Sequence, residues 1–274
     1  MSLIKIDETK CKKDGICVQE CPMAIIRQRD KDSSPAMIGR GAQACILCGH
    51  CVAVCPHGAL GHEKIPPTNC PPILKDLTIT REQAVQFLRS RRSVRRFNNK
   101  PMEKKTIQSL IDTARYAPTG GNFQLVTWTV FSDEAKIKQI VKLTIDGLRE
   151  KVKSASNDDM ASYLPTIVAA YDAGIDSITH GAPCLIFASA PEICVNGMED
   201  LIIALSYLEL AAVSQGIGTC WMGLIARALK DFEPLKKAVG LPESHSHSFP
   251  MVLGYPKFKY HRLPERKPAE IFWR

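Results

Sequence analysis

The spacing of hydrophobic and polar residues changes near residue 64. Before that point the apolar pieces are short: residues 3–6 alternate in a way that predicts a strand, and residues 36–38 and 59–61 are further short apolar pieces. The two halves, 3–26 and 36–61, form an imperfect internal repeat of strand, cysteine loop and short helix. Because such a unit is too small to build a sufficient apolar core, it needs another source of stability.

A proline-rich segment separates this part from the rest of the chain. Residues 66–72 contain four prolines in seven residues, which favours an extended, semi-rigid connection. The sequence therefore predicts a first domain at 1–64, a linker at 65–79 and a second domain at 80–274.

Beyond the linker, helical patterns alternate with short runs rich in β-branched and aromatic residues. Thr80 and Gln83 have the spacing of a capping box, and Ile107, Leu110 and Ala114 lie on one face of the next helix. Helices are predicted over 80–90, 103–117, 134–152, 160–173 (interrupted near Pro165) and 199–215, and strands over 125–131, 184–188, 219–222 and 250–253. This order predicts an α+β or α/β domain whose sheet of about four or five strands is covered by helices.

The composition is that of a globular chain of modest positive charge: 274 residues, 45% of them hydrophobic, and a net charge of +8. Basic and acidic residues are interleaved, which argues against nucleic-acid binding. Residues 1–7 form no apolar export segment, and Ser206 and Glu209 interrupt the longest apolar stretch, 201–213, so no membrane segment is expected. We therefore expect a soluble protein in the reducing cytoplasm, without disulfides.

Cysteines are concentrated in the first domain, which holds seven of the eleven within its first 55 residues. The run from Cys45 to Pro56 reads C-x2-C-x2-C-x3-C-P. Its first three thiolates can wrap one face of a [4Fe-4S] cluster, while the fourth turns to a second cluster. A partner motif, C-x3-C-P, begins at Cys17. A tetrahedral zinc site is the alternative, but zinc sites do not require the two Cys-Pro endings found here.

Asp14 stands where the first motif should have a cysteine. Because the fourth cysteine of each run crosses over, two ligand sets are predicted. The first cluster would use Cys11, Cys17 and Cys55, with Asp14 at its fourth corner, and the second would use Cys45, Cys48, Cys51 and Cys21. Asp14 can ligate iron through oxygen, leave a [3Fe-4S] cluster with an open corner, or be a solvated loop acid. An oxygen ligand holds iron less firmly than sulfur does, so the first cluster should be the more labile.

With these motifs, residues 1–64 resemble the two-cluster bacterial-type ferredoxins, in particular their aspartate-substituted members. Their clusters would supply the stability that the small core lacks. The other four cysteines, Cys70, Cys184, Cys194 and Cys220, are expected to be small buried apolar residues.

Two segments of the second domain suit a flat ligand that carries a phosphate. Residues 91–97 gather four arginines around Ser93, which favours a phosphate clamp over a merely basic solvated loop. Residues 117–124 form a small-residue turn after a helix, where glycines permit close backbone approach and Asn122 and Gln124 offer amides. A plain helix end is the alternative for that turn, and residues 216–223, taken alone, are mostly core.

Together the R-x-S-x-R, A-P-T-G-G-N-x-Q and G-x-G-T-C-W-M-G segments resemble the nitroreductase family of FMN-dependent oxidoreductases over residues 80–274, and the whole chain is similar to ferredoxin–nitroreductase fusions. The resemblance implies an α+β domain with a central mixed sheet and a homodimer with FMN at its interface. Arg91, Arg92, Ser93 and Arg95 would hold the FMN phosphate and ribityl end. Pro118, Thr119 and Gly120 would lie along the isoalloxazine, with Asn122 near it in the partner subunit's site. Met222 and Gly223 would present backbone N–H groups to the ring, and Arg266, then Lys267, would close on the phosphate.

The expected function is that of an iron–sulfur flavoenzyme, whose clusters relay electrons to FMN for reduction of a nitro, quinone or similarly electron-poor small molecule. No side chain is needed as an acid or base, and His57 and His180 are expected to be structural, although His180 could line the substrate pocket. A ferredoxin or NAD(P)H is the expected donor; the chain lacks a G-x-G-x-x-G after a strand, but family members stack nicotinamide on the flavin. The alternatives are a non-catalytic ferredoxin-type electron carrier with a flavin docking domain, and ene reduction or reductive dehalogenation on the same scaffold.

Overall fold

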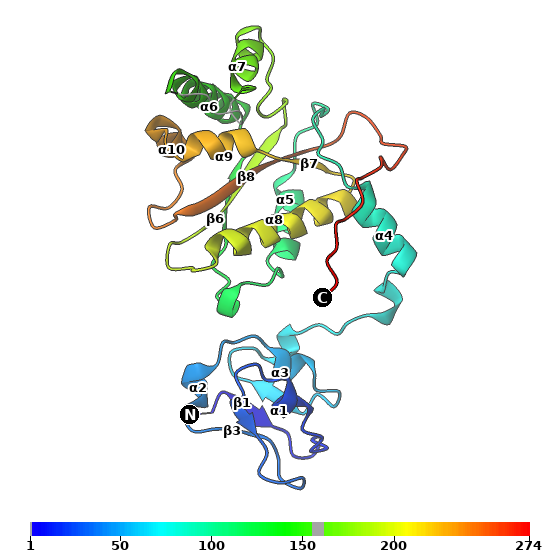
Figure 1. Cartoon of the computed structure of the whole chain (residues 1–274). Helices are drawn as coiled ribbons and strands as arrows, with labels where there is room; N and C mark the ends of the chain where they lie inside the picture. The colour runs from blue at the N-terminus through cyan, green and yellow to red at the C-terminus, as the bar shows by residue number, and fades with distance from the viewer. Residues whose placement is uncertain (1, 155–161) are drawn as a thin grey trace. The chain divides into compact units, whose positions relative to one another are not determined.

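The computed structural model describes residues 2–154 and 162–274 (Figure 1). Its contacts divide the chain into two compact units. The first runs to Ile79 and includes the short segment Gly121–Phe123, and the second comprises Thr80–Gly120 and Gln124–Arg274.

The first unit repeats one pattern of strand, helix and strand. β1 (Ile4–Ile6), α1 (Ile16–Glu20) and β2 (Ile26–Arg27) are followed by β3 (Ala36–Met37), α2 (Gly41–Ala44), α3 (His50–Ala53) and β4 (Leu60–His62). β1 pairs antiparallel with β4, and β2 with β3, so each half contributes one strand to each ribbon. The buried core is small, with Ile4, Ile25, Ile26 and Leu60 among its members. The strand predicted at residues 3–6 is present as β1, and the apolar pieces 36–38 and 59–61 coincide with β3 and β4.

The proline-rich segment is less extended than its composition predicts. Pro66 has extended backbone angles, but two short 3-10 turns follow, η1 (Pro67–Asn69) and η2 (Lys75–Leu77). Cys70 is exposed, which corrects the expectation that it is a buried apolar residue.

The second unit contains a four-stranded sheet with the order β5-β6-β8-β7, in which neighbouring strands are antiparallel. Its strands are β5 (Thr127–Phe131), β6 (Cys184–Ala190), β7 (Gly218–Trp221) and β8 (His247–Gly254). Its helices are α4 (Arg81–Ser90), α5 (Lys104–Ala114), α6 (Glu134–Ser154), α7 (Leu164–Asp172), α8 (Gly197–Ser214), α9 (Gly223–Leu229) and α10 (Glu233–Val239). The predicted α+β class is confirmed. A mixed sheet was expected, but its four strands are all antiparallel to their neighbours. Among the described residues, the parallel pairing is a single bridge between Ser93 and Thr219 at the β7 edge.

Helices cover both faces of this sheet, as Figure 1 shows, with α5 and α8 on one face and α6, α9 and α10 on the other. Successive residues of β6 therefore enter different cores: Ile186 packs in the core with α5 and α8, and Leu185 and Phe187 pack in the opposite core. A strand buried on both faces appears in the sequence as a continuous apolar run, which is what residues 184–188 show.

Each predicted helix of the second domain has a counterpart, with one change near Pro165. The proline lies in the first turn of α7, where its missing N–H costs nothing, so it begins the helix instead of interrupting it. The predicted start of that helix at Met160 lies outside the described residues. Among the helices of residues 2–154 and 162–274, none is both long and apolar enough to cross a membrane.

Candidate functional site

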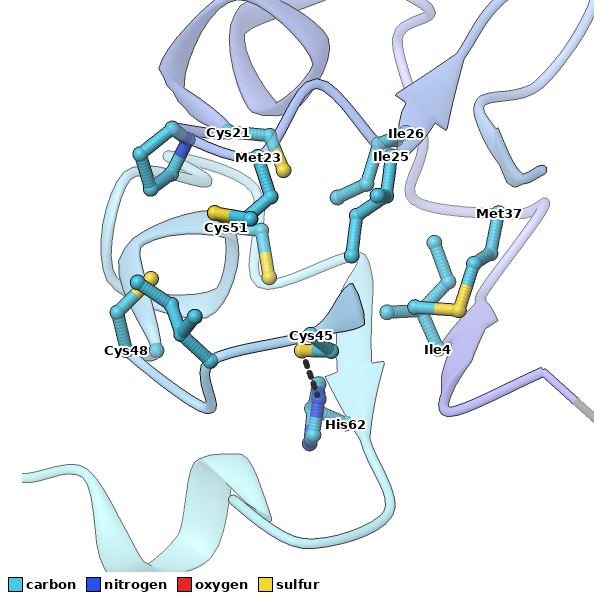
Figure 2. A pocket seen from close by; sticks show the side chains of 13 residues that line it. Ile4, Cys21, Met23, Ile25, Ile26, Met37, Cys45, Cys48, Cys51 and His62 are labelled. Carbon is cyan, nitrogen blue, oxygen red and sulfur yellow. Dashed lines mark hydrogen bonds between the residues drawn. The ribbon is translucent and has the colours of Figure 1, made fainter. Parts of the chain in front are cut away.

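The four cysteines predicted for the second cluster line one cavity of the first unit. Cys21 follows α1, whereas Cys45, Cys48 and Cys51 come from the loop and helix between β3 and β4. Figure 2 shows their side chains around this cavity, whose other walls include Ile4 and Met37. The cavity has a volume of about 380 Å³ and is partly open to solvent. Spacing in the sequence and chain crossover in the fold thus bring the four thiols together.

The thiols of this cavity are arranged so that bound iron ions would favour their ionisation. Burial and the neighbouring Cys48 and Cys21 raise the pKa of the Cys51 thiol to about 11. Thiols crowded in this way resist ionisation until a positive centre is present, and iron provides one. All eleven cysteines are free thiols, so none of the four is tied up in a disulfide. The residues present therefore fit a four-thiolate iron–sulfur cluster.

His62 also lines this cavity, and its proximity was not predicted from the sequence. Its Nε2 lies 3.8 Å from Cys45 Sγ (Figure 2), and its Nδ1 accepts a hydrogen bond from the Lys64 N–H at 3.1 Å. Burial lowers the pKa of His62, which favours the neutral imidazole. Its place at the end of a strand, one turn before a proline-rich segment, offered no signal of this contact.

The residues predicted for the first cluster line a second cavity of the same unit. Its walls contain Cys11, Asp14, Cys17 and Cys55, together with His57. Burial and the nearby Cys55 raise the pKa of the Cys17 thiol. Cys55 Sγ accepts a hydrogen bond from the Ala59 N–H at 3.3 Å. Three thiols and one carboxylate fit an iron–sulfur cluster with a distinct fourth corner.

Asp14 is held in place by two contacts. Its Oδ1 accepts a hydrogen bond from the Ile16 N–H at 3.2 Å, and its Oδ2 lies 3.5 Å from His57 Nε2. His57, which was expected to be structural, lies beside the acid at the cavity wall. The carboxylate is therefore positioned by its surroundings, in the wall of the cavity that Cys11, Cys17 and Cys55 also line.

In the second unit, the arginine-rich segment is attached to the edge of the sheet. The Val94 N–H donates to the Thr219 carbonyl at 2.8 Å, next to the parallel bridge between Ser93 and Thr219. Gly218 allows this approach, because a Cβ built there would lie 2.6 Å from Val94 Cγ2. The edge of the sheet thus fixes the backbone on which the predicted phosphate-binding side chains stand.

The side chains of this segment have different partners. Arg91 forms an ion pair with Glu209, Arg92 lies over the Tyr260 ring at 5.9 Å, and Arg95 donates to the Ser93 carbonyl at 3.4 Å. Arg91, Arg92 and Ser93 are half-buried and Arg95 is exposed. Three guanidinium groups and a hydroxyl on one short segment suit a phosphate group, so the residues fit the phosphate end of FMN.

The turn that should lie along the flavin is held by an acid that the sequence did not reveal. Asp200, buried in the first turn of α8, accepts a hydrogen bond from the Gly120 N–H at 2.9 Å. The Gln124 N–H donates to Thr119 Oγ1 at 3.0 Å, and Asn122 has a φ of 57° within η3 (Gly120–Asn122). Pro118 is exposed just before this turn, so its ring is open to a ligand.

The remaining residues predicted to contact FMN differ in whether their donor groups already have a partner in the chain. The Met222 N–H donates to the Pro250 carbonyl at 3.0 Å, so it is already paired, which corrects the expectation that it serves a ligand. Gly223 begins α9, where helix N–H groups have no partner within the helix. Arg266 and Lys267 lie in the exposed tail after β8, and the structure does not bring them to a partner among the described residues.

Two family models match separate parts of the chain. Residues 88–255 match the model of the nitroreductase family, which is more than half of the chain. The chain belongs to the nitroreductase family. Residues 9–60 match the model of the 4Fe-4S dicluster domain, so a dicluster ferredoxin domain precedes the nitroreductase domain. The predicted resemblance is confirmed, and the chain is an iron–sulfur flavoprotein oxidoreductase. Both matches support the predicted cofactors, FMN and two iron–sulfur clusters.

Solved structures share the fold of the second unit. A nitroreductase with bound FMN from Desulfitobacterium hafniense is 22% identical, covers 71% of this chain and 99% of its own, and has a TM-score of 0.56. An FMN-bound nitroreductase from Bacteroides fragilis is 20% identical, with coverages of 69% and 99% and a TM-score of 0.53. A protein of Archaeoglobus fulgidus with the provisional name NADH dehydrogenase/NAD(P)H nitroreductase is 24% identical over 176 residues, which is 64% of this chain and 87% of that protein.

Proposed function

We propose that this protein passes electrons from a ferredoxin or NAD(P)H donor through its iron–sulfur clusters to FMN, and reduces a nitro, quinone or similarly electron-poor small molecule. The observation that carries the proposal is the cavity lined by Cys21, Cys45, Cys48 and Cys51 in a chain that belongs to the nitroreductase family. FMN, when bound, exchanges one or two electrons at a time and so links one-electron carriers to two-electron reductions.

The residues of the second unit divide the binding of FMN between them. Arg91, Arg92, Ser93 and Arg95 would bind the phosphate and ribityl end, and Pro118, Thr119 and Gly120 would contact the ring. Gly223 would add a backbone donor, with Arg266 and Lys267 as further contacts. Asn122, which belongs to the first unit by its contacts, would lie near the ring in the partner subunit's site. We also propose a homodimer with FMN at its interface, because the tail residues Phe272 and Trp273 are 81% and 90% exposed, and a second subunit would cover them. We propose the cytoplasm as its location, because its reducing conditions keep the cluster cysteines from forming disulfides.

Anaerobic purification, followed by iron, sulfide and FMN assays, tests the cofactors. Cys48→Ala should leave FMN bound but abolish reduction by a ferredoxin or viologen donor, because a relay needs its second cluster. Cys70→Ala is the matched control, since Cys70 is exposed and lies outside both cavities. Equal reduction rates in Cys48→Ala and the parent protein would refute the relay.

Turnover of a nitroaromatic compound distinguishes the enzyme from an electron carrier. The holoprotein, supplied with dithionite or NAD(P)H, should consume the compound catalytically. A protein that exchanges electrons with a donor but turns over no acceptor would instead be a carrier with a flavin docking domain.

A further inference from the structure

His62 is a buried histidine at the end of β4 that belongs to neither predicted ligand set. It is 5% exposed and is paired across the β1–β4 ribbon with Ile4. Its Nε2 points toward Cys45 Sγ, 3.8 Å away, as the dashed line in Figure 2 marks. The imidazole therefore contacts the sulfur of a predicted ligand of the second cluster while being shielded from water.

The backbone determines which ring nitrogen carries the proton. Because the Lys64 N–H donates to Nδ1 at 3.1 Å, Nδ1 acts as an acceptor, and in the neutral ring Nε2 then carries the hydrogen. The Ile65 N–H donates to the His62 carbonyl at 3.2 Å and closes the turn that holds Lys64 in this position. The Nε2–H group is thus fixed as a donor that faces Cys45.

The same arrangement argues against His62 as an additional iron ligand. A ligating nitrogen must offer a lone pair, whereas Nε2 carries the hydrogen and Nδ1 is occupied by Lys64. Four thiols already line the cavity, so the second cluster needs no further ligand.

We propose that His62 is a positioning residue of the second cluster, whose Nε2–H donates a hydrogen bond to the Cys45 thiolate and raises the reduction potential of that cluster. The inference rests on the proposed function, since it requires the cluster to be present. Reduction adds one electron from an external reductant and places more negative charge on the sulfurs, so a donor to sulfur stabilises the reduced state more than the oxidised one. No bond is broken in this step, and His62 remains neutral.

Redox titration of the anaerobically purified full chain with dithionite, followed by electron paramagnetic resonance, tests the proposal. In His62→Leu the equilibrium constant for reduction of the second cluster should fall about tenfold, which is about 59 mV for a one-electron couple. His62→Gln, whose amide can still donate to Cys45, should recover most of the loss. His261→Leu, which removes an exposed histidine of the tail, should leave the potential unchanged.

The outcomes separate this inference from the proposed function. A parent protein without the second cluster would contradict the proposed function itself. If His62→Leu keeps its full iron and sulfide content and the reduction potential of the second cluster is unchanged, only the role of His62 is overturned. The same holds if this potential is as low in His62→Gln as in His62→Leu. If His62→Leu cannot hold the cluster, its potential cannot be measured. Pulsed paramagnetic resonance on protein with isotope-labelled histidine then tests directly whether His62 contacts the cluster. One histidine nitrogen should couple to the reduced cluster and the coupling should be lost in His62→Gln, whereas its absence from the parent protein would overturn the proposal.

Discussion

Arg91 donates to the carboxylate of Glu209 over a distance of 3.2 Å, although the two residues are 118 positions apart in the sequence. The side chain of Glu209 is only 7% exposed, and its carboxylate also accepts hydrogen bonds from Thr219 Oγ1 at 2.9 Å and Trp221 Nε1 at 3.1 Å. A carboxylate held by three donors has a fixed direction, so it fixes the guanidinium as well. Arg91 is therefore oriented by the protein before a phosphate arrives.

Replacement of Glu209 should weaken both the fold and FMN binding. In Glu209→Gln the buried ion pair is lost and at least one donor is left without an acceptor, so the free energy of unfolding should fall by about 2–4 kcal/mol. Urea denaturation followed by tryptophan fluorescence measures this, because Trp128, Trp221 and Trp273 all belong to the second unit. FMN titration measures the affinity.

Glu199→Gln is the control for this change, since Glu199 is an exposed acid on the same helix. It should alter neither quantity by much. An FMN affinity in Glu209→Gln equal to that of the parent protein would show that Arg91 does not depend on this carboxylate.

A side chain at Gly218 should overlap with Val94, and a smaller residue at position 94 should relieve part of the overlap. A Cβ at Gly218 would lie 2.6 Å from Val94 Cγ2, closer than two carbons can approach. Gly218→Ala should therefore destabilise the second unit by about 1–3 kcal/mol, the usual effect of overpacking. In the double variant with Val94→Ala part of that loss should disappear, because the two Cγ contacts are removed while Val94 Cβ, 2.8 Å from the added Cβ, remains. Strictly additive losses of unfolding free energy in this cycle would contradict the direct contact.

Asp176 should make a contribution to stability that disappears in acid. Burial alone would raise the pKa of its carboxyl, but hydrogen bonds from the Thr179 side chain and the N–H groups of Gly181, Thr179 and Ile178 outweigh burial and lower the pKa below 3.8. A lowered folded-state pKa means that this stability is present above pH 3.8 and is lost as the pH falls through the folded-state pKa. These hydrogen bonds hold the loop in which His180 has a φ of 57°.

The test of this contribution is the unfolding free energy of Asp176→Asn as a function of pH. The variant should be less stable than the parent protein by a constant amount at neutral and mildly acidic pH, and the difference should shrink below pH 3.8. Glu199→Gln, a replacement of an exposed acid on α8, controls for general charge effects. A difference that does not change with pH would contradict the assignment.

Local patterns in the sequence were sufficient for most of the elements. The capping box predicted at Thr80 forms in full, because the Gln83 N–H donates to the Thr80 side chain and the Thr80 N–H donates to the Gln83 side chain. The buried strand β6 was visible as a continuous apolar run. The cysteines assigned to each cluster come together in one cavity, since fixed spacing around a compact metal group leaves the chain few alternatives.

Contacts between residues distant in the sequence could not be predicted in this way. Asp200 holds the Gly120 N–H from 80 positions away, and no local period encodes such a pair. A signal did exist for Glu209, because an acid within an apolar helix requires a buried partner, but the sequence did not say which one. The hydrogen bond from the Met222 N–H to the Pro250 carbonyl depends on the register of β8, so it could not be predicted from the sequence either.

Asp14→Cys separates the three roles that remain open for Asp14. The side chain lies in the wall of the cavity with Cys11, Cys17 and Cys55, where a thiolate could complete the set. If Asp14 leaves an open corner, the parent protein should show the near-isotropic signal of an oxidised [3Fe-4S] cluster, and Asp14→Cys should remove it and raise the iron content. If Asp14 ligates iron, the parent protein should lack that signal when purified anaerobically and gain it on brief exposure to air, because oxygen ligation is weaker, and Asp14→Cys should resist this conversion. A signal in the anaerobic protein that persists in Asp14→Cys would contradict both roles and leave Asp14 as a loop acid held by Ile16 and His57.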